Sequence, residues 1–177
     1  MTETTFMKCA CSDIDDKISK LKQDAVYSGK KQPKLYFAGP WFTTKGKLLM
    51  DGIIEAVEHL GSACKYNVYF PKQHTATSPY ITYNDNIDAI DEADVVIALV
   101  CEKDVGTAFE IGYAKAKNKD IYLLGYDKTC FESKTNIMLA FAGDDNIVLD
   151  DLMHFLRDED YQSISVADSW ENKEWIK

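Results

Sequence analysis

Residues 94–100, with the sequence DVVIALV, constrain the fold of this chain more than any other segment. They form a near-continuous apolar run that is rich in valine and isoleucine. Such runs are typical of a strand that is covered on both faces, as the central strands of parallel sheets are. Parallel strands must be joined by crossover connections, which are usually helices, so the flanking sequence should alternate between strands and helices.

Segments with strand and helix character do alternate along the chain. Runs that predict further strands lie at 34–39, 66–71, 120–126 and 146–150. Segments that predict helices lie at 45–61, 82–93, 106–117, 135–142 and 151–158. This alternation predicts an α/β fold, an open sheet of about five parallel strands with helices on both faces. Ligands of such sheets bind at the carboxyl ends of the strands, so the loops after Gly39, Val100 and Tyr126 are candidate binding segments.

The alternating region predicts one domain over residues 34–158. Residues 1–33 are expected to form an N-terminal extension, with an amphipathic helix at 12–26 followed by a linker. Residues 159–177 are expected to be a C-terminal tail.

Charge and composition exclude several classes of function. The net charge of -9 argues against a nucleic-acid partner, because phosphate binding favours a basic face, but it leaves small nucleosides and nucleotides open. No apolar run approaches the roughly 20 residues of a membrane helix, and the N-terminus lacks the pattern of a secretory signal. We therefore expect a cytoplasmic protein without a membrane partner. The five cysteines are scattered and show no zinc-binding spacing, so we expect no metal site.

Glu110 lies in the segment DVGTAFEIGYA, among small and apolar residues. We expect it near the start of a helix that follows the central strand, where the helix dipole favours the ionised carboxylate. Gly106 and its small neighbours leave room for a ligand. A carboxylate in this position can act as a nucleophile at a glycosidic carbon. Periodicity alone slightly favours the alternative, an ordinary acid at the N-terminal end of a helix.

The loop GPWFTTKGK, at 39–47, follows the first predicted strand. It begins at Gly39 but has neither the dinucleotide-binding nor the P-loop spacing. Trp41 and Phe42 are candidates for an aromatic wall against a flat ligand such as a nucleobase. The alternative is that these two side chains cover the edge of the sheet.

Four segments together resemble the nucleoside 2-deoxyribosyltransferase family. LYFAGPWF, DNIDAIDEADVVIALV, DVGTAFEIGYA and TNIML occur in the order and spacing of that family, over roughly residues 34–150. The resemblance implies a flavodoxin-like fold, no cofactor, and a role in nucleotide salvage. It also implies that a deoxyribosyl group is transferred between nucleobases through a covalent intermediate.

The resemblance assigns roles to individual residues. It makes Glu110 the nucleophile and Tyr36 the residue that holds it in place, while Asp104 binds sugar hydroxyls. Asn136 and Met138 correspond to residues that reach into the site of a neighbouring subunit. The resemblance therefore implies a homo-oligomer built from dimers with shared active sites, acting on a 2′-deoxynucleoside and a free nucleobase.

One position departs from the family pattern. The best-known members carry an aspartate near the reacting base, where this chain has Asn86. This leaves open the proton source for the leaving base, which could be a neighbouring acid or water.

Two other functions remain open at this stage. A related hydrolase would cleave 2′-deoxynucleoside 5′-monophosphates, but it would need a phosphate pocket and typically a serine in place of Asn136. The hydroxyls and lysines of residues 43–47 keep that option open. A catalytically silent nucleotide-binding module is disfavoured, because Tyr36, Asp104 and Glu110 occur together.

Overall fold

The computed structural model describes residues 32–131 and 136–164. Five parallel strands form one sheet in the order β2-β1-β3-β4-β5. The strands are β1 Lys34–Ala38, β2 Asn67–Tyr69, β3 Val95–Leu99, β4 Asp120–Gly125 and β5 Asp145–Val148. This confirms the predicted open parallel sheet, and its strand order is that of flavodoxin-like folds. The helix predicted at 12–26 lies outside the described residues.

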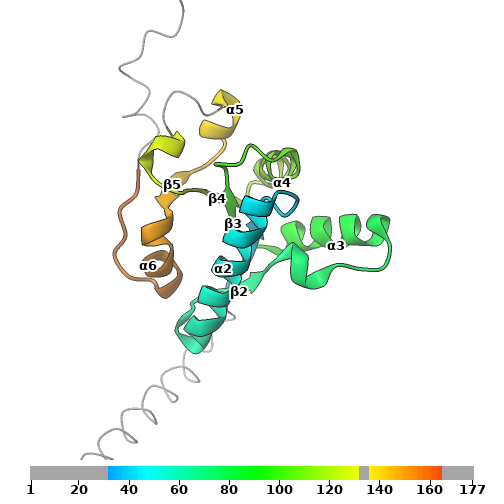
Figure 1. The fold of residues 1–177 in the computed structure, drawn as a ribbon, viewed down its shortest axis with the longest axis horizontal. Coiled ribbons are helices and arrows are strands. Elements are labelled where there is room, and N and C mark those ends of the chain that lie inside the picture. Colours follow the sequence, from blue (N-terminus) through cyan, green and yellow to red (C-terminus); the bar gives the residue numbers. More distant parts are fainter. Residues whose placement is uncertain (1–31, 132–135, 165–177) are drawn as a thin grey trace, which may run out of the picture. The chain divides into compact units, whose positions relative to one another are not determined.

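Helices cover both faces of the sheet. They are α2 Thr44–Leu60, α3 Pro79–Glu92, α4 Val105–Ala116, α5 Ile137–Ala140 and α6 Leu152–Arg157. In Figure 1, α2 crosses in front of the strands. Side chains of α2 and α6 share one core cluster with Leu35 and Phe37, whereas side chains of α3 and α4 share the other with Tyr36 and Ala38. Alternate residues of β1 therefore point to opposite layers, as the pleat requires.

Local sequence signals set several helix ends. The hydroxyl of Thr43 accepts a hydrogen bond of 3.0 Å from the Gly46 amide at the start of α2, and α2 stops at Gly61, whose φ of 47° favours glycine. Helix α3 begins with Pro79, earlier than predicted, because proline fits the first turn of a helix.

Two elements are shorter in the structure than the sequence predicted. Strand β2 spans only Asn67–Tyr69, and α5 is a single turn of four residues. Short 3-10 turns, η1 Gly61–Ala63, η2 Pro71–His74, η3 Lys128–Phe131 and η4 Leu149–Asp151, lie between the regular elements. Within 32–131 and 136–164, no helix has the length and apolar character needed to cross a membrane.

Candidate functional site

Tyr36 of β1 and Glu110 of α4 are in direct contact. Tyr36 lies in the middle of β1 with no exposed surface, and its hydroxyl donates a hydrogen bond of 2.6 Å to Glu110 Oε1. The two residues are 74 positions apart in the sequence, and the pairing of β1 with β3 brings them together. The contact that the family resemblance implied is therefore present.

The pKa of Glu110 departs from the expectation. Burial raises it from 4.5 to about 7; the hydrogen bond from Tyr36 opposes the rise and the negative charge of Asp104 adds to it. We expected the helix dipole to favour the ionised form, but α4 begins at Val105, so Glu110 lies beyond the first turn, where the dipole acts most strongly. Loss of hydration dominates instead, and the carboxyl group titrates near neutral pH.

Asp104 is the N-cap residue of α4 and stands beside Glu110. Its Oδ2 accepts hydrogen bonds from the Thr107 amide at 2.8 Å and from the Thr107 hydroxyl at 3.1 Å. A Cβ atom at Gly106 would lie 3.0 Å from the same oxygen, so glycine keeps this turn uncrowded. Because Oδ2 serves the cap, Oδ1 remains to accept a hydrogen bond from a ligand hydroxyl.

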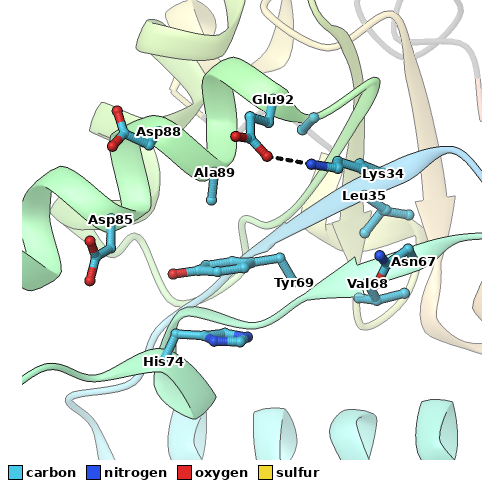
Figure 2. A pocket seen from close by; sticks show the side chains of 11 residues that line it. Lys34, Leu35, Asn67, Val68, Tyr69, His74, Asp85, Asp88, Ala89 and Glu92 are labelled. Carbon is cyan, nitrogen blue, oxygen red and sulfur yellow. Dashed lines mark hydrogen bonds and ion pairs between the residues drawn. The ribbon is translucent and has the colours of Figure 1, made fainter.

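Tyr69 connects Tyr36 to Asn86. Its ring stacks on Tyr36, with centroids 5.6 Å apart, and on His74 at 4.2 Å; Figure 2 shows the Tyr69 and His74 rings lying parallel. The Tyr69 hydroxyl donates a hydrogen bond of 3.3 Å to Asn86 Oδ1. Because the amide oxygen is engaged, the amide nitrogen of Asn86 remains to donate to a ligand. The sequence analysis missed Tyr69, which only the strand register, Tyr36 opposite Tyr69, places here.

A cavity of about 710 Å³ opens where β3 and β4 end. Its lining includes Asp104 and Asn136, but Tyr36 and Glu110 are not among the lining residues. Asn136 caps α5 by accepting a hydrogen bond of 2.9 Å from the Met138 amide. The side chain of Met138 is 78% exposed. The structure thus places Asn136 beside the Asp104 cavity of its own chain and directs Met138 toward solvent.

The aromatic residues of the loop after β1 have different environments. Phe42 is 88% exposed, whereas Trp41 packs against the core, with Lys72 Nζ 5.6 Å from its ring centroid. Trp41 is therefore a packing residue in this chain, whereas Phe42 is free to contact a ligand. Gly39 is buried, and a Cβ atom there would lie 2.4 Å from the sulfur of Met50, so glycine lets the loop pass close to α2.

A second cavity, of about 500 Å³, lies between α3 and strand β2 (Figure 2). Tyr69 and His74 form one side of it, Asp85 and Asp88 come from α3, and an ion pair joins Lys34 to Glu92 at its end. In the part of the chain that the structure describes, no group of three or more histidine, cysteine, aspartate or glutamate side chains is placed to hold a metal ion.

A sequence model of the family described as nucleoside 2-deoxyribosyltransferase matches residues 35–161. The chain belongs to this family. The nucleoside 2-deoxyribosyltransferase family indicates a glycosyl-handling enzyme that acts on nucleosides, by transfer or by hydrolysis. No curated protein matches the chain in a sequence comparison.

Solved structures share the fold of this family member. The 2-deoxyribosyltransferase of Bacillus psychrosaccharolyticus is similar to it with a TM-score of 0.55 and 17% identity, over 75% of this chain and 99% of the other. A conserved protein from Enterococcus faecalis V583 matches with a TM-score of 0.55 and 20% identity, over 72% and 99% of the two chains. The CMP N-glycosidase BcmB of Clostridium botulinum gives a TM-score of 0.47 and 23% identity, over 71% and 97%. At the identities of the first two structures, the likeness describes the fold and not the reaction.

Proposed function

We propose that the protein is a nucleoside 2-deoxyribosyltransferase that exchanges the base of 2′-deoxynucleosides through a covalent deoxyribosyl-glutamate intermediate. The hydrogen bond of 2.6 Å from Tyr36 to the partly buried Glu110, beside Asp104, supports this proposal most directly. The bond leaves the second carboxylate oxygen, Oε2, available to attack, and it restricts the rotation of the side chain.

In the first step, a carboxylate oxygen of Glu110 attacks C1′ of the deoxynucleoside. The bond from C1′ to the base nitrogen breaks, and its electron pair leaves with the base, which then takes up a proton. The transition state has oxocarbenium character, so the negative charge of the glutamate stabilises it. With a pKa of about 7, close to half of Glu110 is ionised at neutral pH.

In the second step, a nitrogen of the incoming base attacks C1′ of the ester and gives up its proton. The bond from C1′ to the ester oxygen breaks and releases the Glu110 carboxylate. Two successive displacements retain the configuration at C1′. Asp104 is proposed to hold a sugar hydroxyl through Oδ1 while its other oxygen caps α4.

Asn86 is proposed to serve the base. Its oxygen is engaged by Tyr69, so its NH₂ group can donate a hydrogen bond to an acceptor atom of the leaving base. An amide does not release a proton, so the proton itself comes from a neighbouring acid or from water. Gly39, Trp41, Phe42 and Gly106 stay in the proposed substrate-binding set, although Trp41 and Gly39 have packing contacts in this chain.

The proposed enzyme is an oligomer of dimers with shared active sites. Exposed apolar side chains of α3, α4 and α5 support a subunit interface there; they are Tyr80, Tyr83, Val105, Phe109 and Met138. A remixing experiment tests the sharing. Glu110→Ala and Asn136→Ala proteins are unfolded together and reassembled, and about a quarter of the sites should then be intact if the interface is isologous. Activity equal to the mean of the two separate mutants would exclude a shared active site.

The activity is tested with a 2′-deoxynucleoside and a different free base, followed by chromatography of the products. We expect a new deoxynucleoside to form. The corresponding ribonucleoside should exchange its base much more slowly, because a 2′-hydroxyl destabilises the oxocarbenium-like state. Glu110→Gln should lower the rate by at least ~10³-fold. Glu55→Gln, on the exposed side of α2, makes the same charge change and should keep the rate. Normal exchange by the Glu110→Gln protein would exclude the mechanism.

A second candidate is hydrolysis of 2′-deoxynucleoside 5′-monophosphates. Lys45 and Lys103 line the cavity beside Asp104, where they could meet a phosphate. This enzyme would use the same glutamate, and it would release the base from the monophosphate without forming a new nucleoside. Release of no base from either substrate would instead favour the silent binding module.

A further inference from the structure

Three side chains in the Asp104 cavity form a cluster that the proposed chemistry does not use. Glu102 follows β3, Tyr126 follows β4, and Lys45 lies in the first turn of α2, yet all three line the same cavity. Glu102 Oε1 accepts a short hydrogen bond from the Tyr126 hydroxyl and lies 3.1 Å from Lys45 Nζ. Lys45 Nζ also lies 4.3 Å from the centroid of the Tyr126 ring.

These contacts fix the charge and the position of Glu102. The hydrogen bond from Tyr126 and the ion pair with Lys45 hold the pKa of the Glu102 carboxyl below its ordinary value, so the group is ionised at neutral pH. The Glu102 side chain is only 17% exposed, whereas that of Lys45 is 70% exposed. The carboxylate is therefore held at the cavity wall, and the lysine that could attract an anion is already paired.

The charges on the cavity wall balance one another. The charged lining residues are Lys45, Glu102, Lys103 and Asp104, so two positive charges face two negative ones. A 5′-phosphate carries about −1.5 to −2 charges at pH 7. It would meet both carboxylates, while of the two lysines Lys45 is already paired with Glu102. Juxtaposed like charges oppose binding strongly, whereas an uncharged 5′-hydroxyl can donate a hydrogen bond to either carboxylate.

We propose that Glu102 is a specificity-determining residue that makes this site select 2′-deoxynucleosides with a free 5′-hydroxyl and reject their 5′-monophosphates. The inference rests on the proposed transferase function and deepens it by naming the residue that sets the choice between the two substrates. Selectivity arises from a repulsive element, together with the loss of a lysine as a phosphate partner. Removing the carboxylate should release Lys45 and convert the same cavity into one that accepts a phosphate.

The experiment compares a deoxynucleoside with its own 5′-monophosphate as glycosyl donor. We expect wild type to prefer the nucleoside, and Glu102→Gln to raise the relative kcat/KM for the monophosphate by at least ~10-fold. Adding Lys45→Gln to Glu102→Gln should cancel that gain. Glu55→Gln, with an equal charge change on the exposed side of α2, should leave the preference unchanged.

A second variant does not depend on how well Glu102→Gln folds, and an inhibition measurement gives a separate readout of phosphate binding. Tyr126→Phe removes the hydroxyl that holds Glu102 and should lower the preference a few-fold while the charge remains. Inorganic phosphate should inhibit nucleoside exchange weakly in wild type and at least ~10-fold more strongly in Glu102→Gln. Chloride at equal ionic strength controls for screening.

The outcomes separate the two proposals. Wild type that exchanges bases on nucleosides, together with an unchanged preference in Glu102→Gln and Tyr126→Phe, overturns the role of Glu102 alone. A wild-type preference for the monophosphate would also overturn the role of Glu102, and it would favour the hydrolase. If wild type exchanges no base, the proposed transferase function is wrong. Thermal stabilisation by phosphate then tests Glu102 without turnover, and equal stabilisation of wild type and Glu102→Gln would overturn the role of Glu102.

Discussion

Substitution of Tyr36 by phenylalanine should move the pH dependence of the reaction. The ring and its stacking on Tyr69 remain, but the hydrogen bond to Glu110 is lost. That bond favours the ionised carboxylate, so its loss raises the pKa of Glu110 above its present value of about 7. A hydrogen bond to a charged group contributes about 1.5–3 kcal/mol, which corresponds to about one to two pH units.

The rate at pH 7 follows from this shift. In wild type about half of Glu110 is ionised at pH 7, whereas in Tyr36→Phe the ionised share falls to between about 1% and 10%. We therefore expect base exchange at pH 7 to fall about 5- to 50-fold and to recover toward the wild-type rate near pH 9 to 10.

The assay is the initial rate of base exchange between pH 5.5 and 10, with saturating donor and acceptor. Tyr122→Phe is a suitable control, because this half-buried tyrosine contacts the core on the other face of the sheet. A loss that is equal at every pH would refute the electrostatic account and would leave Tyr36 only a role in holding Glu110 in position.

Three further substitutions test the surroundings of the site. Glu110→Gln should stabilise the protein in urea unfolding by about 3 kcal/mol at pH 8 and by less than about 1 kcal/mol at pH 5. Between pH 4.5 and about 7 the folded carboxyl keeps a proton that the unfolded one loses, so wild-type stability falls as pH rises. Equal gains at both pH values would contradict this. Asp104→Asn should keep the helix cap but should move the acidic limb of the pH–rate profile to lower pH, because it removes a negative charge beside Glu110. Tyr36→Phe moves that limb to higher pH, and a shift to higher pH in Asp104→Asn would contradict a role for the Asp104 charge. Gly39→Ala should lower the free energy of unfolding by about 1–3 kcal/mol, because the new methyl group meets Met50. Gly52→Ala, with open space around it, should not destabilise the protein, so equal thermal shifts of the two variants would contradict the packing argument.

The order of strands and helices could be predicted from the sequence because apolar periodicity records which face each residue buries. The same periodicity placed the start of α3 too late, because it gave no weight to Pro79 as a first-turn residue. The helix-dipole argument gave the wrong sign for the pKa of Glu110, since burial depends on what packs over a helix and not on the helix itself. The contact of Tyr36 with Glu110 came from the family resemblance.

The site residues that the sequence did not reveal come together only when distant segments of the chain pair in the sheet. Tyr69 contacts Tyr36 because the two are register partners in β1 and β2, and no local pattern states that register. Glu102 and Tyr126 belong to different loops and meet because β3 and β4 end side by side. Such clusters require the three-dimensional arrangement.

The pairing of Tyr36 with Glu110 has a consequence for how activity emerges as the chain folds. Strand β1 precedes its partner β3 by about 60 positions, as the hydrogen bond from the Lys34 amide to Asp94 shows, and the glutamate follows later still. Contacts of such long sequence separation close slowly. An early folding intermediate with native-like helices can therefore lack any catalytic capacity. In refolding experiments, recovered base exchange should lag behind the helical circular dichroism signal, so turnover would report the final closure of the sheet.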